Sequence, residues 1–125
     1  MNITIHPNDD IFLGIKVDCA FDIRIDGKLA GYGGVSETDN EGEIYLEYVE
    51  LYIPFKGRHL YRDVLLTIAE YFHANVFVLE SSVENRSIYE HFGAEEVYPP
   101  DYVREMWSYR LPTERLQEAE RTEKE

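Results

Sequence analysis

The hydrophobic pattern changes period twice between residues 53 and 79, and this constrains the fold more than any other feature of the 125 residues. Up to Ile53 apolar residues alternate as in a strand, and a turn containing Pro54 and Gly57 follows. Apolar residues then recur every four positions, which is typical of one face of a helix of about four turns: Leu60, Val64, Ile68 and Phe72. Residues 75–79 form a short apolar run, typical of a buried parallel strand. This order predicts two parallel strands joined by a right-handed helical crossover.

The residues before this segment predict antiparallel strands. Residues 1–7 alternate weakly and predict an edge strand, and residues 11–20 alternate in a way that favours a strand over a helix. Residues 21–25 and 29–36 flank Asp26-Gly27, a strong two-residue hairpin signal. Residues 43–53 predict one long strand with these side chains on a single face: Tyr45, Glu47, Val49, Leu51 and Ile53.

The residues after it predict a second helix and two more strands. Residues 81–84 read as a capping box, and the helix that follows ends at Gly93, a good C-terminal cap, with Ile88, Tyr89 and Phe92 as its apolar face. Residues 94–98 and 105–111 predict the last strands. We expect an α+β fold with a mixed, mostly antiparallel sheet, a central parallel pair and two main helices. Residues 1–111 form one domain, and the charged tail 112–125, with Leu116 and Ala119 as its apolar residues, is expected to fray.

Composition excludes several classes of protein. No apolar stretch approaches the roughly 20 residues that cross a bilayer, and residues 1–7 lack the basic start and apolar block of a signal peptide. The single cysteine, Cys19, fits a reducing compartment, so we expect a cytoplasmic protein. A net charge of −13 opposes nucleic-acid binding and favours a cationic small molecule or a basic protein as partner. We find no metal-ligand spacing and no serine or cysteine nucleophile motif, and we expect no metal.

The turn before the first helix has the chemistry of a phosphate site. Lys56, Gly57 and Arg58 place two cations and a glycine directly ahead of a helix. Backbone N–H groups at such a helix start bind pyrophosphate well. The same cations oppose the helix dipole, so without an anion they are mildly unfavourable. The plain alternative is an ordinary basic helix start.

Three segments resemble the GNAT family of acyl-CoA N-acyltransferases. Residues 21–32 resemble its central hairpin, and residues 49–66 resemble its acyl-CoA strand, pyrophosphate loop and long helix. Residues 84–94 resemble its later helix, with Tyr89 followed by Gly93 and Ala94. The resemblance implies a GNAT-like fold. Only residues 8–20 are available for the helices that usually follow the first strand, so these are expected to be reduced or absent.

The resemblance also implies a function. It implies an acetyl-CoA-dependent N-acetyltransferase that moves an acetyl group to a primary amine, for example a cationic acceptor such as a lysine or a polyamine. Acetyl-CoA is then the acyl donor, and these residues are implied as its contacts: Ile53, Lys56, Gly57, Arg58, His59, Leu60, Tyr61, Arg62 and Asn85.

Catalytic roles are carried over in the same way. Tyr89 matches the proton donor to the leaving thiolate, and its plain alternative is a packing tyrosine beside Phe92. A carboxylate on the long strand is the natural general base. Glu47 and Glu50 point to opposite faces there; we favour Glu50 because it lies nearer the end where the sheet would open, although a solvated strand face explains either residue. His59 and His91 are further acid/base candidates.

Two residues depart from the family pattern and motivate an alternative. His59 stands where the loop has its second glycine, and Tyr61 stands where it has glycine or alanine. The alternative is a catalytically degenerate chain of this fold that acts as a binding or regulatory module, such as a virus-encoded protein. A third interpretation is a plain α+β interaction domain, which predicts that the strands beside the crossover do not splay apart. The tyrosines of residues 45–52 could serve a homodimer interface.

Overall fold

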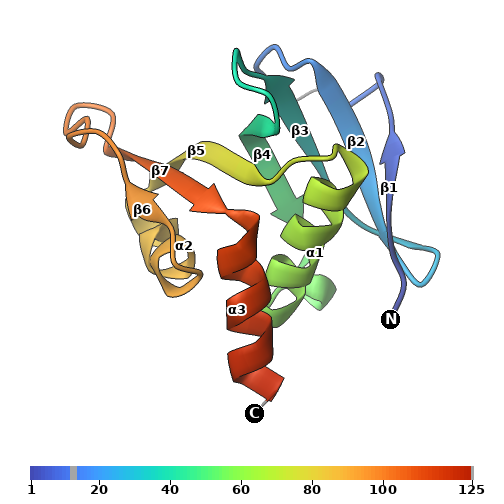
Figure 1. Cartoon of the computed structure of the whole chain (residues 1–125). Helices are drawn as coiled ribbons and strands as arrows, with labels where there is room; N and C mark the ends of the chain where they lie inside the picture. Colours follow the sequence, from blue (N-terminus) through green and yellow to red (C-terminus); the bar gives the residue numbers. More distant parts are fainter. Residues whose placement is uncertain (12–13, 125) are drawn as a thin grey trace.

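The computed structural model describes residues 1–11 and 14–124, without the side chains of Arg58 and residues 119–124. Seven strands form one sheet in the order β1-β2-β3-β4-β5-β7-β6 (Figure 1). The strands are β1 (Ile3–Pro7), β2 (Cys19–Ile25), β3 (Lys28–Glu37), β4 (Glu43–Leu51), β5 (Val76–Ser82), β6 (Glu95–Glu96) and β7 (Met106–Pro112). The helices are α1 (Arg58–Tyr71), α2 (Arg86–His91) and α3 (Thr113–Lys124), with 3₁₀ turns η1 (Ile53–Phe55) and η2 (Val83–Asn85).

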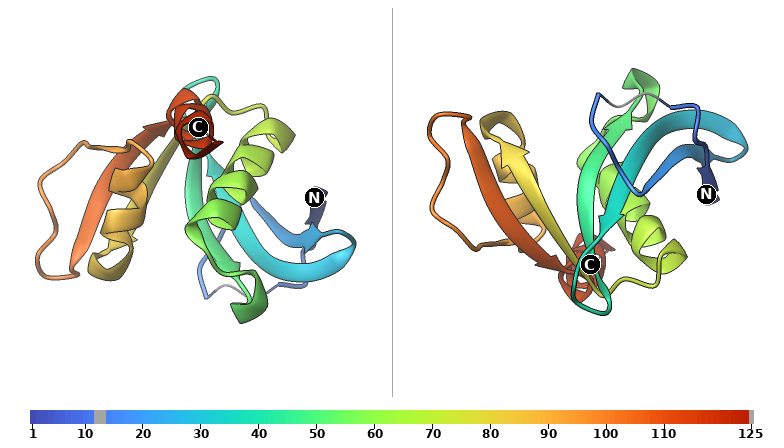
Figure 2. Two further views of the ribbon diagram at one scale, coloured as in Figure 1. Left: turned by 90° about the horizontal axis from the view of Figure 1, so that it is seen from below. Right: turned by 90° about the horizontal axis from the view of Figure 1, so that it is seen from above.

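The sheet opens between its two parallel strands. β4 and β5 form the predicted parallel pair, but only three residues of each strand are in register, Glu43 to Tyr45 with Val76 to Val78. Beyond that point the strands diverge, and the sheet divides into the arms β1–β4 and β5–β7–β6 (Figure 2). This divergence is the opposite of what a plain interaction domain predicts.

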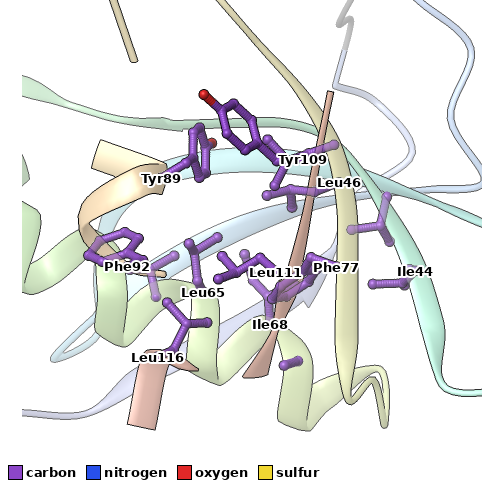
Figure 3. Packing of buried hydrophobic residues seen from close by; sticks show 14 of the residues in the cluster. Ile44, Leu46, Leu65, Ile68, Phe77, Tyr89, Phe92, Tyr109, Leu111 and Leu116 are labelled. Carbon is purple, nitrogen blue, oxygen red and sulfur yellow. The ribbon is translucent and has the colours of Figure 1, made fainter. Parts of the chain in front are cut away.

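The core lies between the sheet and its helices. α1 contacts β1 and α3, while α2 and α3 contact β7. The predicted helical face of α1 is confirmed, since Val64, Leu65 and Ile68 are fully buried. Figure 3 shows Leu65 and Ile68 packed with core residues from α2 and the strands. The mixed α+β fold is therefore the predicted one, and the described residues before Ile53 contain no helix.

A β-bulge corrects the predicted face of β4. Gly34 pairs with Tyr48 but Val35 pairs with Leu46, so Glu47 is left without a partner in the register. The bulge reverses the alternation, because Leu46 before it and Leu51 after it are both buried. The prediction that alternate residues from position 45 to 53 share one face is wrong for this reason.

Several predicted boundaries are also corrected. Residues 14–18 form no strand, and 12–13 lie outside the described residues. β5 continues to Ser82, whose side chain makes no cap hydrogen bond, so the capping box is wrong. The strand predicted over residues 94–98 shrinks to Glu95–Glu96. The tail forms α3, in which Leu116 is fully buried. None of the helices in the described part of the chain has the length and apolar character to span a bilayer.

Gly31 holds β3 close to β4 just behind the opening. A Cβ at this position would overlap the Glu50 carbonyl oxygen and lie 3.0 Å from the Cα of Leu51. Because the obstacle is backbone, β4 itself would have to move. We therefore expect Gly31→Ala to lower the free energy of unfolding by about 1–3 kcal/mol. Urea unfolding measures this, and unchanged stability would show that β4 can shift there without cost.

Candidate active site

A cavity of about 190 Å³ lies where β4 and β5 separate. Its walls come from β4, the turn before α1, the first turn of α1, and η2 together with α2. Of the residues that the structure describes, nine line it: Val49, Glu50, Leu51, Lys56, Gly57, Tyr61, Asn85, Ile88 and Tyr89. Segments far apart in the sequence therefore meet at the opening of the sheet, which is where ligands tend to bind in open sheets with parallel strands.

The start of α1 forms one end of this cavity. Gly57 is its N-cap residue, with φ 153°, a backbone conformation that favours glycine. No described side chain caps the helix start, and no acidic residue occupies its first turn. The first N–H groups of a helix have no partner within it. This end of the cavity thus combines unsatisfied N–H groups with the positive end of the helix dipole, which suits an anion.

Two tyrosines meet on another wall. The Tyr61 and Tyr89 hydroxyl oxygens are 2.6 Å apart, and the two rings pack edge to face. Tyr61 also stacks on Phe92, and Tyr89 stacks on Tyr109. Figure 3 shows the Tyr89 and Tyr109 rings beside each other above the core. Both hydroxyl groups of the Tyr61–Tyr89 pair are therefore held by packed rings at the edge of the cavity.

The surroundings keep both phenols protonated at neutral pH. Burial raises the pKa of Tyr89, and the hydrogen bond with Tyr61 lowers it again in part. Burial, Tyr89 and the Glu50 carboxylate together hold the pKa of Tyr61 well above its ordinary value.

A carboxylate and an ammonium group complete the polar lining. Lys56 Nζ lies 3.1 Å from Glu50 Oε1, and both side chains are exposed to solvent over part of their surface. The pair joins the end of β4 to the turn before α1. Exposed pairs of this kind contribute about 0.2–1 kcal/mol, so a ligand charge can replace either partner at little cost.

The cavity brings together only some of the predicted site residues. Of the predicted catalytic pair, both Tyr89 and Glu50 line it, whereas Glu47 does not. The predicted cofactor contacts in its lining are Lys56, Gly57, Tyr61 and Asn85. Those outside its lining are Ile53, His59, Leu60 and Arg62, while the Arg58 side chain lies outside the described part of the chain.

The residues outside the lining have other surroundings. Ile53 is 82% exposed, and Leu60 packs against the core. His59 Nδ1 lies 3.1 Å from a terminal nitrogen of Arg62, which is fully buried and pairs with Asp63 at 3.1 Å. Arg62 thus lies within α1 with its side chain buried in the protein.

The sequence did not predict a functional role for three apolar residues of the lining: Val49, Leu51 and Ile88. Val49 and Leu51 follow the bulge, and the alternation of apolar residues in the sequence does not predict the bulge. Ile88 belongs to the predicted apolar face of α2, and periodicity alone does not distinguish a cavity wall from a core contact.

Comparison with known proteins adds evidence on the fold. No family model matches the sequence, and no curated protein does so at a significant level. Solved structures do match. An IAA acetyltransferase from Bacillus cereus superposes with a TM-score of 0.62 at 11% identity, covering 89% of this chain and 99% of that one. A GNAT family acetyltransferase from Elizabethkingia anophelis, with acetyl-CoA bound, gives 0.59 at 13% identity over 89% and 98% of the two chains.

A third match is shorter. An acyl-CoA N-acyltransferase from Pseudomonas aeruginosa gives a TM-score of 0.56 at 18% identity, covering 74% of this chain and 66% of that one. The chain thus spans about two thirds of that protein and nearly the whole of the first two. It has the GNAT fold. The resemblance that the sequence suggested is confirmed at the level of the fold.

The elements that surround the cavity are those of the GNAT fold. The parallel pair of β4 and β5, the opening after it, and α1 between these strands are all present. The departures of this chain are local. Tyr61 stands where the loop pattern has a small residue, and its hydroxyl group forms a hydrogen bond with that of Tyr89.

Proposed function

We propose that the chain is an acetyl-CoA-dependent N-acetyltransferase that transfers an acetyl group to a primary amine. One observation carries the proposal: an uncapped helix start, a protonated tyrosine and a carboxylate line the same cavity at the opening of the sheet. These are the groups that a thioester donor, a leaving thiolate and an attacking amine require. The matching structures of acetyltransferases support it.

Each group has a role in this proposal. The N–H groups at the start of α1, with Lys56, would hold the pyrophosphate, and Asn85 would contact the donor or the acceptor. The bound thioester supplies an activated acetyl group. Glu50 takes a proton from the ammonium group of the acceptor, which frees the nitrogen to attack, and Tyr89 gives a proton to the sulfur that leaves.

The acceptor is proposed to be cationic. The chain carries a net charge of −13, and Glu50 stands partly exposed at the cavity. An acidic surface raises the local concentration of cations and speeds their encounter. Polyamines and lysine side chains of basic proteins are the acceptors that fit. The single cysteine fits a reducing compartment, for which we propose the cytoplasm.

A variant of His59 tests the anion site. His59 is the second residue of α1 and is exposed. We expect His59→Glu to weaken acetyl-CoA binding at least tenfold, because a carboxylate there repels the pyrophosphate. The same carboxylate favours the helix dipole by about 0.3–1 kcal/mol, so thermal stability should be unchanged or higher. Isothermal titration with acetyl-CoA measures the affinity.

The matched control is Lys28→Gln, which changes the net charge equally at the exposed start of β3. It should bind acetyl-CoA like the wild type. If His59→Glu and the wild type bind acetyl-CoA with equal affinity, the pyrophosphate does not bind at the start of α1. Wild-type protein that gives no heat and no thermal shift at millimolar acetyl-CoA would overturn the proposed function.

The second candidate is a GNAT-fold binding module without catalysis. It is favoured by the departures at His59 and Tyr61. A thiol-release assay with spermidine, lysine esters and a lysine-rich peptide separates the two candidates. Release of CoA that depends on the amine supports the enzyme, and binding without turnover across these amines supports the module.

A further inference from the structure

We propose that Tyr61 is a positioning residue for Tyr89: its hydroxyl donates a hydrogen bond to the Tyr89 oxygen, which directs the Tyr89 proton into the cavity and stabilises the phenolate left when that proton departs. The inference rests on the proposed function, since it concerns how the general acid of that reaction is tuned. It gives a role to the residue that departs most from the loop pattern of the fold.

The geometry leaves one proton free for the cavity. The two hydroxyl oxygens are 2.6 Å apart, a short O–H···O distance. Among the described residues, this is the one hydrogen bond of either side-chain hydroxyl. One of the two protons lies in the bond and the other points elsewhere. If Tyr61 donates, the proton that remains free is that of Tyr89.

The proposed role of Tyr89 as the acid sets the direction of this bond, because a proton held between the two oxygens cannot leave into the cavity. Once Tyr89 has given up its proton, Tyr61 is the partner that can donate, and its hydrogen bond offsets part of the cost of burying the Tyr89 phenolate. Burial, the neighbouring Tyr89 and the Glu50 carboxylate hold the pKa of Tyr61 well above its ordinary value, so Tyr61 keeps the proton that it donates.

The reaction explains why such support is useful. Glu50 takes a proton from the ammonium group of the acceptor and passes it to water. The neutral nitrogen then forms a bond to the thioester carbonyl carbon, the carbon–sulfur bond breaks with its electron pair on sulfur, and the nitrogen loses its second proton by way of Glu50 to water. The sulfur takes the Tyr89 proton, and Tyr89 later regains a proton from water. A thiol has a pKa of about 8.5 and a phenol of about 10, so this proton moves uphill. A hydrogen bond to the departing phenolate makes the step less unfavourable.

The ring of Tyr61 is held firmly enough to keep this arrangement. It stacks on Phe92 with ring centroids 6.4 Å apart and meets the Tyr89 ring edge to face at 6.1 Å. It stands one turn into α1, where its backbone N–H donates to the Gly57 carbonyl oxygen at 2.9 Å. Phenylalanine at this position would keep the stacking and the helix and lose only the hydroxyl group.

The test is a titration of Tyr89 in Tyr61→Phe. Full-length protein labelled with 3-fluorotyrosine, whose phenol is more acidic, allows titration by fluorine NMR below the pH of alkaline unfolding, and Tyr89→Phe assigns the Tyr89 signal. We expect the pKa of Tyr89 to rise by about 0.5–1 in Tyr61→Phe, because a net hydrogen bond contributes about 0.5–1.5 kcal/mol. A pKa that stays the same or falls would overturn the proposal, since a fall means that Tyr89 was the donor.

Activity and a matched control complete the experiment. We expect Tyr61→Phe to lower kcat by about threefold to tenfold at unchanged KM for acetyl-CoA. Tyr71 is an exposed tyrosine of the same helix, and Tyr71→Phe should change neither kcat nor the Tyr89 titration. If Tyr61→Phe does not fold, the titration of the wild type still tests the proposal, which requires the Tyr89 signal to titrate at a lower pH than the Tyr61 signal. The titration needs no acetyl-CoA. Its failure therefore overturns the role of Tyr61, while absent acetyl-CoA binding overturns the proposed function.

Discussion

Replacement of Tyr89 by phenylalanine is expected to lower kcat about 100-fold while the KM for acetyl-CoA stays within about twofold. General acid catalysis contributes about 10²–10⁴-fold. The low end applies here because a thiolate is a better leaving group than an amine or an alkoxide. The ring itself remains, so its contact with Tyr109 and its place in the core are kept. Steady-state kinetics by thiol release measures both constants.

The effect of this substitution should depend on pH in a definite direction. Burial raises the pKa of Tyr89, so the phenol stays protonated through the neutral range. A thiol with a pKa of about 8.5 needs protonation below that pH and leaves as a stable thiolate above it. The ratio of wild-type to variant kcat should therefore be largest near pH 7 and shrink above about pH 8.5.

The control is Tyr71→Phe, which removes a phenol from the exposed end of α1. It should leave kcat unchanged at every pH. If Tyr89→Phe has the kcat of the wild type, Tyr89 takes no part in the reaction and contributes to packing alone. A constant ratio across pH would argue instead for a role in binding or orientation.

The sequence predicted the parts of this site that depend on neighbouring residues. A proline, a glycine and a helical period specify the turn and α1 within a few residues, because turn chemistry and amphipathicity are local properties. The apolar face of the second helix, with Ile88, Tyr89 and the C-cap residue Phe92, was also predicted by spacing. Tyr89 and the turn were then placed by a resemblance carried in short segments.

The parts that failed depend on contacts between distant residues. The bulge at Glu47 arises where β3 and β4 pair, so alternation within β4 gives no sign of it. Tyr61 looked like an obstacle in the loop because its partner, Tyr89, lies 28 residues further along the chain.

The tail is the clearest case of such a long-range effect. Its sequence has almost no apolar face, and a short charged helix is unstable by itself. The structure fixes the start of α3 from outside: Thr113 donates its backbone N–H to the Asn75 carbonyl oxygen at 2.9 Å. The Arg115 side chain lies against Gly93, and Leu116 is fully buried beside α1.

Leu116→Ala is therefore expected to lower the free energy of unfolding by about 2–5 kcal/mol, the range for a buried leucine that leaves a cavity. This is a large share of the 5–15 kcal/mol that stabilises a typical domain. Leu116 is the described apolar side chain through which α3 joins the core. Loss of its contacts should release α3 from α1 and β7. Urea unfolding gives the change, and the helical signal in circular dichroism should fall before the main transition.

The matched control is Leu29→Ala in β3, where the leucine is 44% exposed. A substitution at such a surface position should change stability by about 0.5 kcal/mol or less. If Leu116→Ala is as mild as Leu29→Ala, then the tail frays as the sequence alone predicts, and the buried position of Leu116 contributes nothing to the domain. A loss of 2 kcal/mol or more would instead make α3 part of the fold, held by contacts with α1 and β7 that no pattern within the tail reveals.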